Sequence, residues 1–150
     1  MVKLALFQPD IAANVGAIMR LCACLGSELH IIEPCGFPWQ EQKIRKTAMD
    51  YYDHVDIIKH ESWESFMRAH EGHRIILMTT KTEHSYHDVH YSDSDILLAG
   101  SESTGAPPYV HEQVAQRITI PMYGAVRSLN LATSCAMVMG EALRQVRGRI

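Results

Sequence analysis

The sequence predicts an α/β fold in which a parallel sheet is flanked by helices. Six short runs of aliphatic and β-branched residues alternate with helical patterns, and such alternation is typical of wound parallel sheets. Several runs are almost continuously apolar, which suits strands covered on both faces. The predicted strands are residues 2–7, 28–33, 55–60, 74–80, 95–100 and 117–122. Because 150 residues match the usual size of one domain, we expect a single core over residues 1–150.

Three helices are predicted from the spacing of apolar residues and from their end signals. The first covers residues 14–25, with Asn14 as an N-cap type of residue and Gly26 directly after the end. The second covers residues 62–70 and opens with Ser62 as its cap. The third covers residues 129–146, where apolar residues recur at helical spacing. These helices provide the layers that cover the predicted sheet.

The composition excludes several classes of function. With 47% apolar and 21% charged residues, the chain has the composition of a globular protein. Its 14 Lys and Arg against 17 Asp and Glu give a formal net charge of −3. This excludes binding of nucleic acid through bulk positive charge, so any such contact needs a local patch. The densest basic cluster, residues 42–46, is predicted on a solvated helix face and is the obvious candidate for phosphate contacts.

The cysteines and the N-terminus bear on the compartment. Cys22, Cys24, Cys35 and Cys135 form no Cys-x-x-Cys pair, which excludes a zinc ribbon and a thioredoxin-type motif. The apolar run of residues 1–7 is too short for the core of a signal peptide. No stretch approaches the roughly 20 apolar residues of a membrane span. We therefore expect a cytoplasmic protein with reduced thiols and no membrane contact.

A segment after the first predicted strand contains Asn14, Gly16 and Arg20. The predicted helix is apolar almost all round, which predicts a buried helix, and Arg20 is its only charge. A buried arginine needs a partner, so we expect Arg20 to meet a carboxylate (Glu28 or Glu102), backbone carbonyls or an anionic ligand. Asn14 by itself is explained by an N-cap.

Two further segments follow predicted strands, where ligand sites gather in open α/β sheets. Residues 97–105 end a strand in Gly-x-Glu-x-x-Gly, which lacks the order of a dinucleotide-binding loop. A plain turn explains these glycines equally well. In the last segment, Pro121 is expected to end the strand, and Ser128 and Asn130 open the final helix as caps or ligand groups.

A histidine-rich segment is a weaker candidate for a metal site. His84, His87 and His90 recur every three residues, but the spacing does not match that of a His-Glu-x-x-His site. The segment reads as a polar loop, and we expect no metal.

Taken together and in order, the three segments resemble the SPOUT RNA methyltransferases of the TrmH class. Asn14, Gly16 and Arg20 match the first motif of that family, and Gly100, Glu102 and Gly105 match the second. Residues 120–122 with 128–130 match the third. The resemblance covers essentially the whole chain, and three motifs in register are more specific than any one alone.

The resemblance implies a SPOUT fold with a C-terminal trefoil knot, a homodimer, and S-adenosylmethionine as methyl donor without a metal. The resemblance implicates Arg20 in removing or stabilising the proton of the ribose hydroxyl, either as a base of strongly perturbed pKa or in an indirect role. We expect it mainly to orient the hydroxyl and its phosphate, assisted by Asn14, Ser128 and Asn130. Glycines at the cofactor are expected because a side chain there collides with the bound ligand. The implied cofactor positions are Met78, Gly100, Glu102, Gly105, Ile120, Met122, Ser128 and Leu129. Glu102 is expected to hold either Arg20 or the loop.

Within the class, residues 6–11, 36–39 and 50–51 resemble enzymes that methylate the wobble ribose of tRNA, on cytidine or a modified uridine. This implies that the tRNA anticodon stem-loop is the partner. Alternatives are 2′-O-methylation at another tRNA or rRNA position, or a non-catalytic module that binds S-adenosylmethionine or RNA. The candidate phosphate contacts are Lys43, Arg45, Lys46 and Arg144, with Arg147 and Arg149 in the tail.

Overall fold

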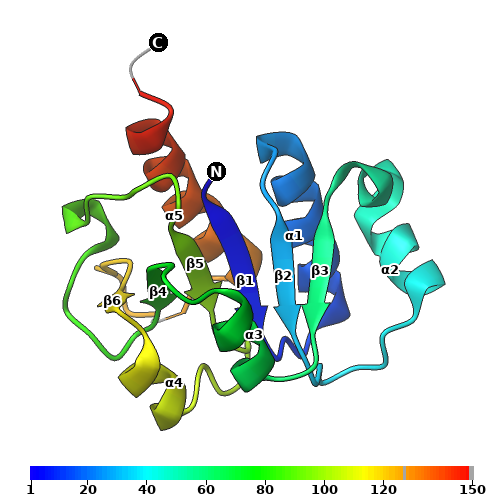
Figure 1. The fold of residues 1–150 in the computed structure, drawn as a ribbon, viewed down its shortest axis with the longest axis horizontal. Coiled ribbons are helices and arrows are strands. Elements are labelled where there is room, and N and C mark those ends of the chain that lie inside the picture. Colours follow the sequence, from blue (N-terminus) through cyan, green and yellow to red (C-terminus); the bar gives the residue numbers. More distant parts are fainter. Residues whose placement is uncertain (127, 149–150) are drawn as a thin grey trace.

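The computed structural model describes residues 1–126 and 128–148 (Figure 1), and these contain one six-stranded sheet. The strand order is β3-β2-β1-β5-β4-β6, and every pair is parallel. The predicted α/β class with a parallel sheet is thereby confirmed. The strands are β1 Lys3–Phe7, β2 Leu29–Ile32, β3 Ile57–His60, β4 Ile75–Met78, β5 Ile96–Ala99 and β6 Gln116–Ile118.

Helices cover both faces of this sheet, as Figure 1 shows. The two longest pack beside each other on one face, while two short helices cover the other face. The helix α2 and a following 3₁₀ turn pack against α1. The α-helices are α1 Ala12–Leu25, α2 Glu41–Ala48, α3 Trp63–Ala69, α4 Pro108–Gln113 and α5 Leu131–Val146, and the 3₁₀ turns are η1 Met49–His54 and η2 Tyr86–Asp88.

Alternate residues along the strands pack into two separate apolar cores. In β1, Leu4 and Leu6 pack in the larger core with α1 and α5, whereas Ala5 and Phe7 pack in the smaller core with α3. All four are at most 3% exposed. Because both faces of the central strands are buried, nearly every residue there is apolar, which is the pattern that the sequence displays. The edge strands β3 and β6 are less buried.

Several predicted element ends are correct and others are wrong. Ser62 caps α3 by accepting a hydrogen bond from the Ser65 N–H at 3.1 Å, and Gly26 ends α1 with a φ of +72°. The first helix, however, begins at Ala12, so Asn14 lies inside its first turn and is not the cap. Asn130 alone caps α5, because Ser128 lies ahead of the helix.

The last strand also ends earlier than predicted. We expected Pro121 to end it, but β6 ends at Ile118. The next residue, Thr119, donates its backbone N–H to the carbonyl of His84 in a neighbouring loop at 2.9 Å. The chain therefore leaves the sheet before the proline, and residues 119–122 become loop.

The motif glycine Gly16 has a packing role. A Cβ atom built on Gly16 lies 2.3 Å from Cγ2 of Thr47 in α2, far inside van der Waals contact. Only a residue without a side chain lets α1 and α2 approach this closely. The first motif thus contributes to the packing of α1 as well as to a site.

Three further expectations concern membrane spans, the state of the cysteines and the knot. Within the described residues, no helix has the length and apolarity needed to cross a membrane. The four cysteines are free thiols, and burial raises the pKa of Cys22 to about 12, which keeps that thiol protonated. The trefoil knot that the resemblance implies stays a prediction.

Candidate functional site

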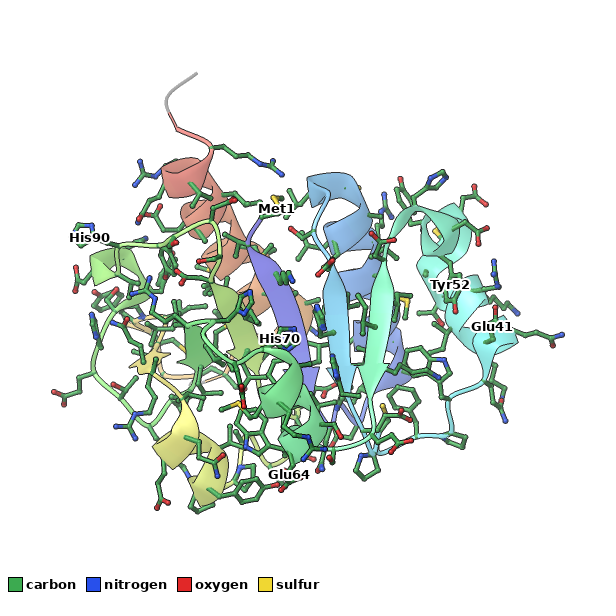
Figure 2. All side chains as sticks on the ribbon, viewed as in Figure 1. Met1, Glu41, Tyr52, Glu64, His70 and His90 are labelled. Carbon is green, nitrogen blue, oxygen red and sulfur yellow. The ribbon has the colours of Figure 1, made fainter. Side chains whose placement is uncertain are left out.

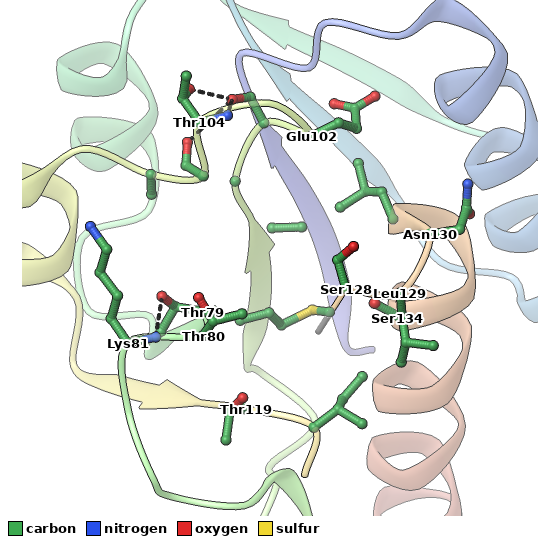
Figure 3. A pocket seen from close by; sticks show the side chains of 18 of the residues that line it. Thr79, Thr80, Lys81, Glu102, Thr104, Thr119, Ser128, Leu129, Asn130 and Ser134 are labelled. Atoms are coloured by element: carbon green, nitrogen blue, oxygen red, sulfur yellow. Dashed lines mark hydrogen bonds between the residues drawn. The ribbon is translucent and has the colours of Figure 1, made fainter. Parts of the chain in front are cut away.

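A cavity of about 500 Å³ opens at the carboxyl ends of β4 and β5 (Figure 3). Its walls are the segment after β4, the loop of residues 100–105, the segment after β6 and the start of α5. This is where an open parallel sheet places ligands, and the volume lies in the range of small-molecule sites. All eight predicted cofactor positions line it, as do Asn14 and Asn130. Arg20 is not among the lining residues.

Glu102 joins the loop after β5 to the beginning of α1. Its Oε1 accepts a hydrogen bond from the backbone N–H of Asp10 at 3.1 Å, and its Oε2 accepts one from that of Ile11 at 3.0 Å. Oε2 also accepts from the Asn14 side-chain amide at 3.1 Å. Of the two roles expected for Glu102, holding the loop is therefore correct and holding Arg20 is not. The carboxylate replaces the side-chain cap that α1 itself lacks.

Asn14 and Asn130 extend this contact into a hydrogen-bonded relay. Because a carboxylate only accepts, Nδ2 of Asn14 must face Glu102, which leaves Oδ1 of Asn14 as an acceptor. That oxygen accepts from Nδ2 of Asn130 at 3.0 Å. Oδ1 of Asn130 in turn accepts from the backbone N–H groups of Ala132 and Thr133 at 2.9 and 3.2 Å. All three motifs are thus connected. The carboxylate of Glu102 at one end and the backbone N–H groups at the start of α5 at the other determine how both side-chain amides are oriented.

The second motif holds its own loop together. Ser101 and Gly105 exchange backbone hydrogen bonds of 3.2 and 2.9 Å, and Ser103 donates to Asp10 across to the loop after β1. That hydrogen bond is the main reason why the pKa of Asp10 is lowered. The loop after β5 is therefore tied both to itself and to the loop after β1.

The two motif glycines follow from this loop geometry. A Cβ on Gly100 lies 2.5 Å from the backbone carbon of Gly105, whereas Gly105 has a φ of +68° with open space around it. The loop itself therefore gives a reason for both glycines, and the expected collision of a side chain with a bound ligand stays a prediction. Gly100 permits the loop to close, and Gly105 permits its left-handed turn.

Arg20 does not fulfil the expectation of a buried, paired arginine. Its side chain is exposed on α1, and its guanidinium carbon lies 4.9 Å from the centre of the Tyr51 ring. Among the described residues, neither Glu28 nor Glu102 forms an ion pair with it, and Glu28 instead pairs with Lys3 at 3.1 Å. The prediction failed because α1 has an uncovered outer face, on which the apolar pattern included small residues that are exposed.

The segment after β4 supplies polar groups that the sequence analysis missed. Thr79, Thr80 and Lys81 line the cavity, and Figure 3 shows Lys81 across the cavity from Asn130. Oγ1 of Thr79 accepts from the backbone N–H of Lys81 at 3.1 Å, which closes the turn. The available signal was their position directly after an apolar strand, the same signal that identified the other segments.

The predicted basic cluster lies on α2, where Ile44 and Ala48 are buried and the charged side chains are exposed. Arg45 is bound to Glu41 at 3.1 Å and to Asp53 at 2.8 Å, and it covers the ring of Tyr52. Lys43 and Lys46 have no ion pair within the described part of the chain. The lysines are therefore the more available phosphate contacts.

The predicted contacts near the C-terminus are engaged within the chain. Arg144 makes two hydrogen bonds of 2.9 Å to Glu141, and these are the main reason why the pKa of Glu141 falls to about 2. Arg147 donates to the carbonyl of Leu25. Arg149 lies outside the described residues. An RNA contact by Arg144 requires exchange of an existing ion pair for a phosphate.

The chain is similar in sequence and in fold to known RNA methyltransferases. The chain is 48% identical over 145 residues to a tRNA (cytidine(34)-2′-O)-methyltransferase of Beijerinckia indica, covering 95% of this chain and 91% of that protein. A solved structure described as "Structural insights into the 2-OH methylation of C/U34 on tRNA" superposes with a TM-score of 0.93 at 39% identity, covering 99% and 98% of the two chains.

A more distant structure shows that the fold is shared more widely. The AdoMet-bound rRNA methyltransferase of Sinorhizobium meliloti superposes with a TM-score of 0.85 at 22% identity, over 95% of this chain and 56% of that one. Residues 1–140 match the family described as the SpoU rRNA Methylase family. With its three motifs joined at one cavity and its sequence matched over nearly its whole length, the chain belongs to the SpoU rRNA methylase family.

Proposed function

We propose that this chain transfers a methyl group from S-adenosylmethionine to the ribose 2′-hydroxyl of nucleotide 34 in tRNA. The observation that carries the proposal is the relay from Glu102 through Asn14 to Asn130 at the rim of the cavity. The relay places two oriented amides beside a cofactor-sized space. The relatives that match along nearly all of the chain are named for this reaction.

The cavity fits S-adenosylmethionine in size and in chemistry. Met122 and Leu129 line it and are 37% and 40% exposed, so they offer apolar surface to an adenine ring. Lys81 and the hydroxyls after β4 suit the charged amino-acid end of the molecule. The eight predicted positions, from Met78 to Leu129, would therefore hold this cofactor. Its sulfonium supplies an electrophilic methyl group, so the protein must position the acceptor hydroxyl.

Asn14, Asn130 and Ser128 position that hydroxyl in this proposal. The two asparagines are held from both ends of the relay, so their amides keep one orientation. Ser128 is exposed at the cavity and has a hydroxyl that can donate or accept. Glu102 is a positioning residue here, because its carboxylate oxygens already accept from Asp10, Ile11 and Asn14.

A second copy of the chain completes the site. Arg20 is exposed and does not line its own cavity, yet a guanidinium is suited to orienting a hydroxyl and its neighbouring phosphate. The outer faces of α1 and α5 adjoin and carry mostly small or apolar exposed residues, which permit close approach of another chain. These residues are Ala13, Ala17, Arg20, Cys24, Thr133, Ala136, Met137 and Gly140. We therefore propose a homodimer in which Arg20 serves the cavity of the other copy.

The tRNA substrate is contacted as an anticodon stem-loop, whose unpaired nucleotides expose the target ribose. Lys43 and Lys46 on α2 supply phosphate contacts from an otherwise acidic chain. In a dimer, two such patches flank the paired sites. We place the protein in the cytoplasm, where tRNA is the substrate.

Methyl transfer from labelled S-adenosylmethionine to bulk tRNA tests the proposal, with nuclease mapping of the labelled nucleotide. We expect the label on the ribose of nucleotide 34. Label on another nucleotide would support methyl transfer as the reaction and refute nucleotide 34 as its target. Binding of S-adenosylmethionine without any transfer, using tRNA from several sources, would refute catalysis and favour a binding module.

A further inference from the structure

Three histidines converge on the sheet face opposite α1 and α5. His30 lies in β2, His60 ends β3, and His70 directly follows α3. One ring nitrogen of each lies within 4.8 Å of the others, the one such group among the described residues. His30 is 4% exposed and His70 is 6% exposed, while His60 is half-buried and gives access from solvent. Figure 2 labels His70, in front of the strands.

The hydrogen bonds determine which ring nitrogens carry protons. Nε2 of His30 lies 3.2 Å from a carboxylate oxygen of Glu28, and Nδ1 of His70 lies 2.9 Å from the carbonyl oxygen of Phe66. Both oxygens can only accept, so these two nitrogens carry the protons. Nδ1 of His30 and Nε2 of His70 consequently carry a lone pair instead of a proton.

The third ring completes the arrangement. Nε2 of His60 lies 2.9 Å from Nδ1 of His30 and must donate to it. A change of tautomer that moves the proton of His60 from Nε2 to Nδ1 leaves a lone pair on Nε2, and the protein loses no proton. After this one tautomer change, each of the three rings carries one nitrogen with a lone pair.

The surroundings keep the three rings in the neutral form that ligates metals. Burial lowers the pKa of His30 to about 4, and burial also lowers the pKa values of His60 and His70. The charged groups nearest the cluster are Glu28 and Lys3, which pair with each other at 3.1 Å. The exposed His73 contacts the ring of His70 from outside.

We propose that His30, His60 and His70 bind a divalent transition-metal ion, with Zn²⁺ as the best match. Ligand nitrogens around tetrahedral zinc lie about 3.3 Å apart, since each Zn–N bond is about 2.0–2.1 Å. Nδ1 of His30 and Nε2 of His60 are 2.9 Å apart, and one nitrogen of each ring lies within 4.8 Å of the others, so these distances bracket the spacing around zinc. Water takes the fourth position through the half-buried side of His60. Such a centre ties β2, β3 and α3 together.

The supporting contacts match those that histidine ligands have in metal centres. A ligating histidine usually donates its other N–H to a carboxylate or a backbone carbonyl, which sets its tautomer and orientation. Glu28 does this for His30, and the Phe66 carbonyl does it for His70. None of the three histidines lines the methyl-transfer cavity, so the centre is separate from the proposed chemistry.

Metal titration of the untagged, chelator-treated full chain tests the site. We expect one equivalent of Zn²⁺ per chain by calorimetry, and visible absorption bands of tetrahedral Co²⁺ when Co²⁺ is used as the probe. Saturation should raise Tm, because the ion binds the folded chain. His60→Gln should abolish the Co²⁺ bands. The matched control His87→Gln alters an exposed histidine outside the cluster and should leave them unchanged.

A second variant keeps the test valid if His60→Gln folds poorly. Glu28→Gln removes the carboxylate behind His30 and should weaken metal binding about 10–100-fold while the fold is retained, as checked by circular dichroism. The proposal is overturned if the native chain binds no Zn²⁺ at micromolar concentrations. It is equally overturned if His60→Gln and Glu28→Gln bind as the native chain does.

Discussion

The cavity and the histidine cluster both gather polar side chains at one sheet, but the side chains come from different kinds of elements and differ in burial. The cavity residues come from loops beyond the strand ends, and Asn130 and Ser128 remain exposed. The cluster residues come from within strands and from a helix end, and His30 and His70 are buried. Exposed polar groups can exchange their partners for a substrate, whereas buried ones require permanent partners.

This difference separates the expected consequences of mutation. A hydrogen bond in the exposed relay contributes only about 0.5–1.5 kcal/mol to stability, so relay variants should fold and lose activity. Leaving a buried polar group without a partner costs about 1–3 kcal/mol, so cluster variants should lose stability and keep activity. Variants in each of the two groups test this contrast.

Arg20→Ala should lower kcat about 1,000-fold, as expected for loss of a cation that stabilises developing charge. Stability should hardly change, because Arg20 is exposed. Single-turnover methyl transfer and thermal unfolding measure the two effects. Arg20→Lys should not restore full turnover if the planar guanidinium is required; near-normal activity of this variant would refute a specific guanidinium role.

Mixing protomers tests where Arg20 acts. An Arg20→Ala chain and an Asn130→Asp chain should each keep no more than about 1% of native activity, but their mixed dimers contain one intact site if Arg20 serves the other copy. Random re-association should then recover about a quarter of native activity, since half of the dimers are mixed and each has one working site. No recovery, with mixed dimers demonstrated by mass, would place Arg20 in its own cavity.

Asn130→Asp should lower kcat about 100-fold, because small misplacement of positioning groups has effects of this size. The aspartate still accepts the backbone N–H groups of Ala132 and Thr133, so the cap of α5 is kept. It cannot donate to Asn14, which interrupts the relay. Glu112→Gln, at an exposed position of α4 outside the cavity and the proposed dimer face, is the control, and activity of Asn130→Asp within threefold of native would contradict the relay's role.

Replacing Lys43 and Lys46 by glutamine should weaken tRNA binding and lower its dependence on salt. Each lost phosphate contact should reduce the slope of log K against log salt by about 0.7–0.9. Arg45→Gln should have a smaller effect, because Arg45 is already paired with Glu41 and Asp53. Filter binding at several salt concentrations measures the slopes, and equal slopes for all variants would exclude α2 from the RNA interface.

The histidine cluster should make stability depend on pH below neutrality. The folded chain holds His30 neutral down to about pH 4, whereas the unfolded chain binds protons from about pH 6.5 downward. The unfolding free energy should therefore fall as pH drops through this window, by up to about 1.4 kcal/mol per pH unit for each histidine.

Chemical denaturation in the presence of a chelator measures this dependence. His60→Gln should show a shallower slope, because one titrating histidine is removed, and His87→Gln should match the native chain. Identical slopes in the native chain and in His60→Gln would show that the cluster does not control acid stability.

Much of the fold and part of the site could be predicted from local patterns. The six strands were predicted because buried parallel strands are continuously apolar, as β5 is. The cavity residues were predicted because motif residues after strands meet at the carboxyl edge of the sheet. The exposure of Arg20 could not be predicted, because small apolar residues such as Ala13 and Ala17 occur on buried and uncovered helix faces alike.

The parallel α/β class, the positions of the strands and the segments that form the cavity follow from local patterns, because hydrophobic periodicity and strand-end motifs are local signals. The packed fold was needed to reveal that Asn14 belongs to a relay instead of a cap, that Gly16 makes room for Thr47, and that His30, His60 and His70 meet. These contacts join elements distant in the chain, and their geometry depends on how the layers pack, which no local pattern encodes.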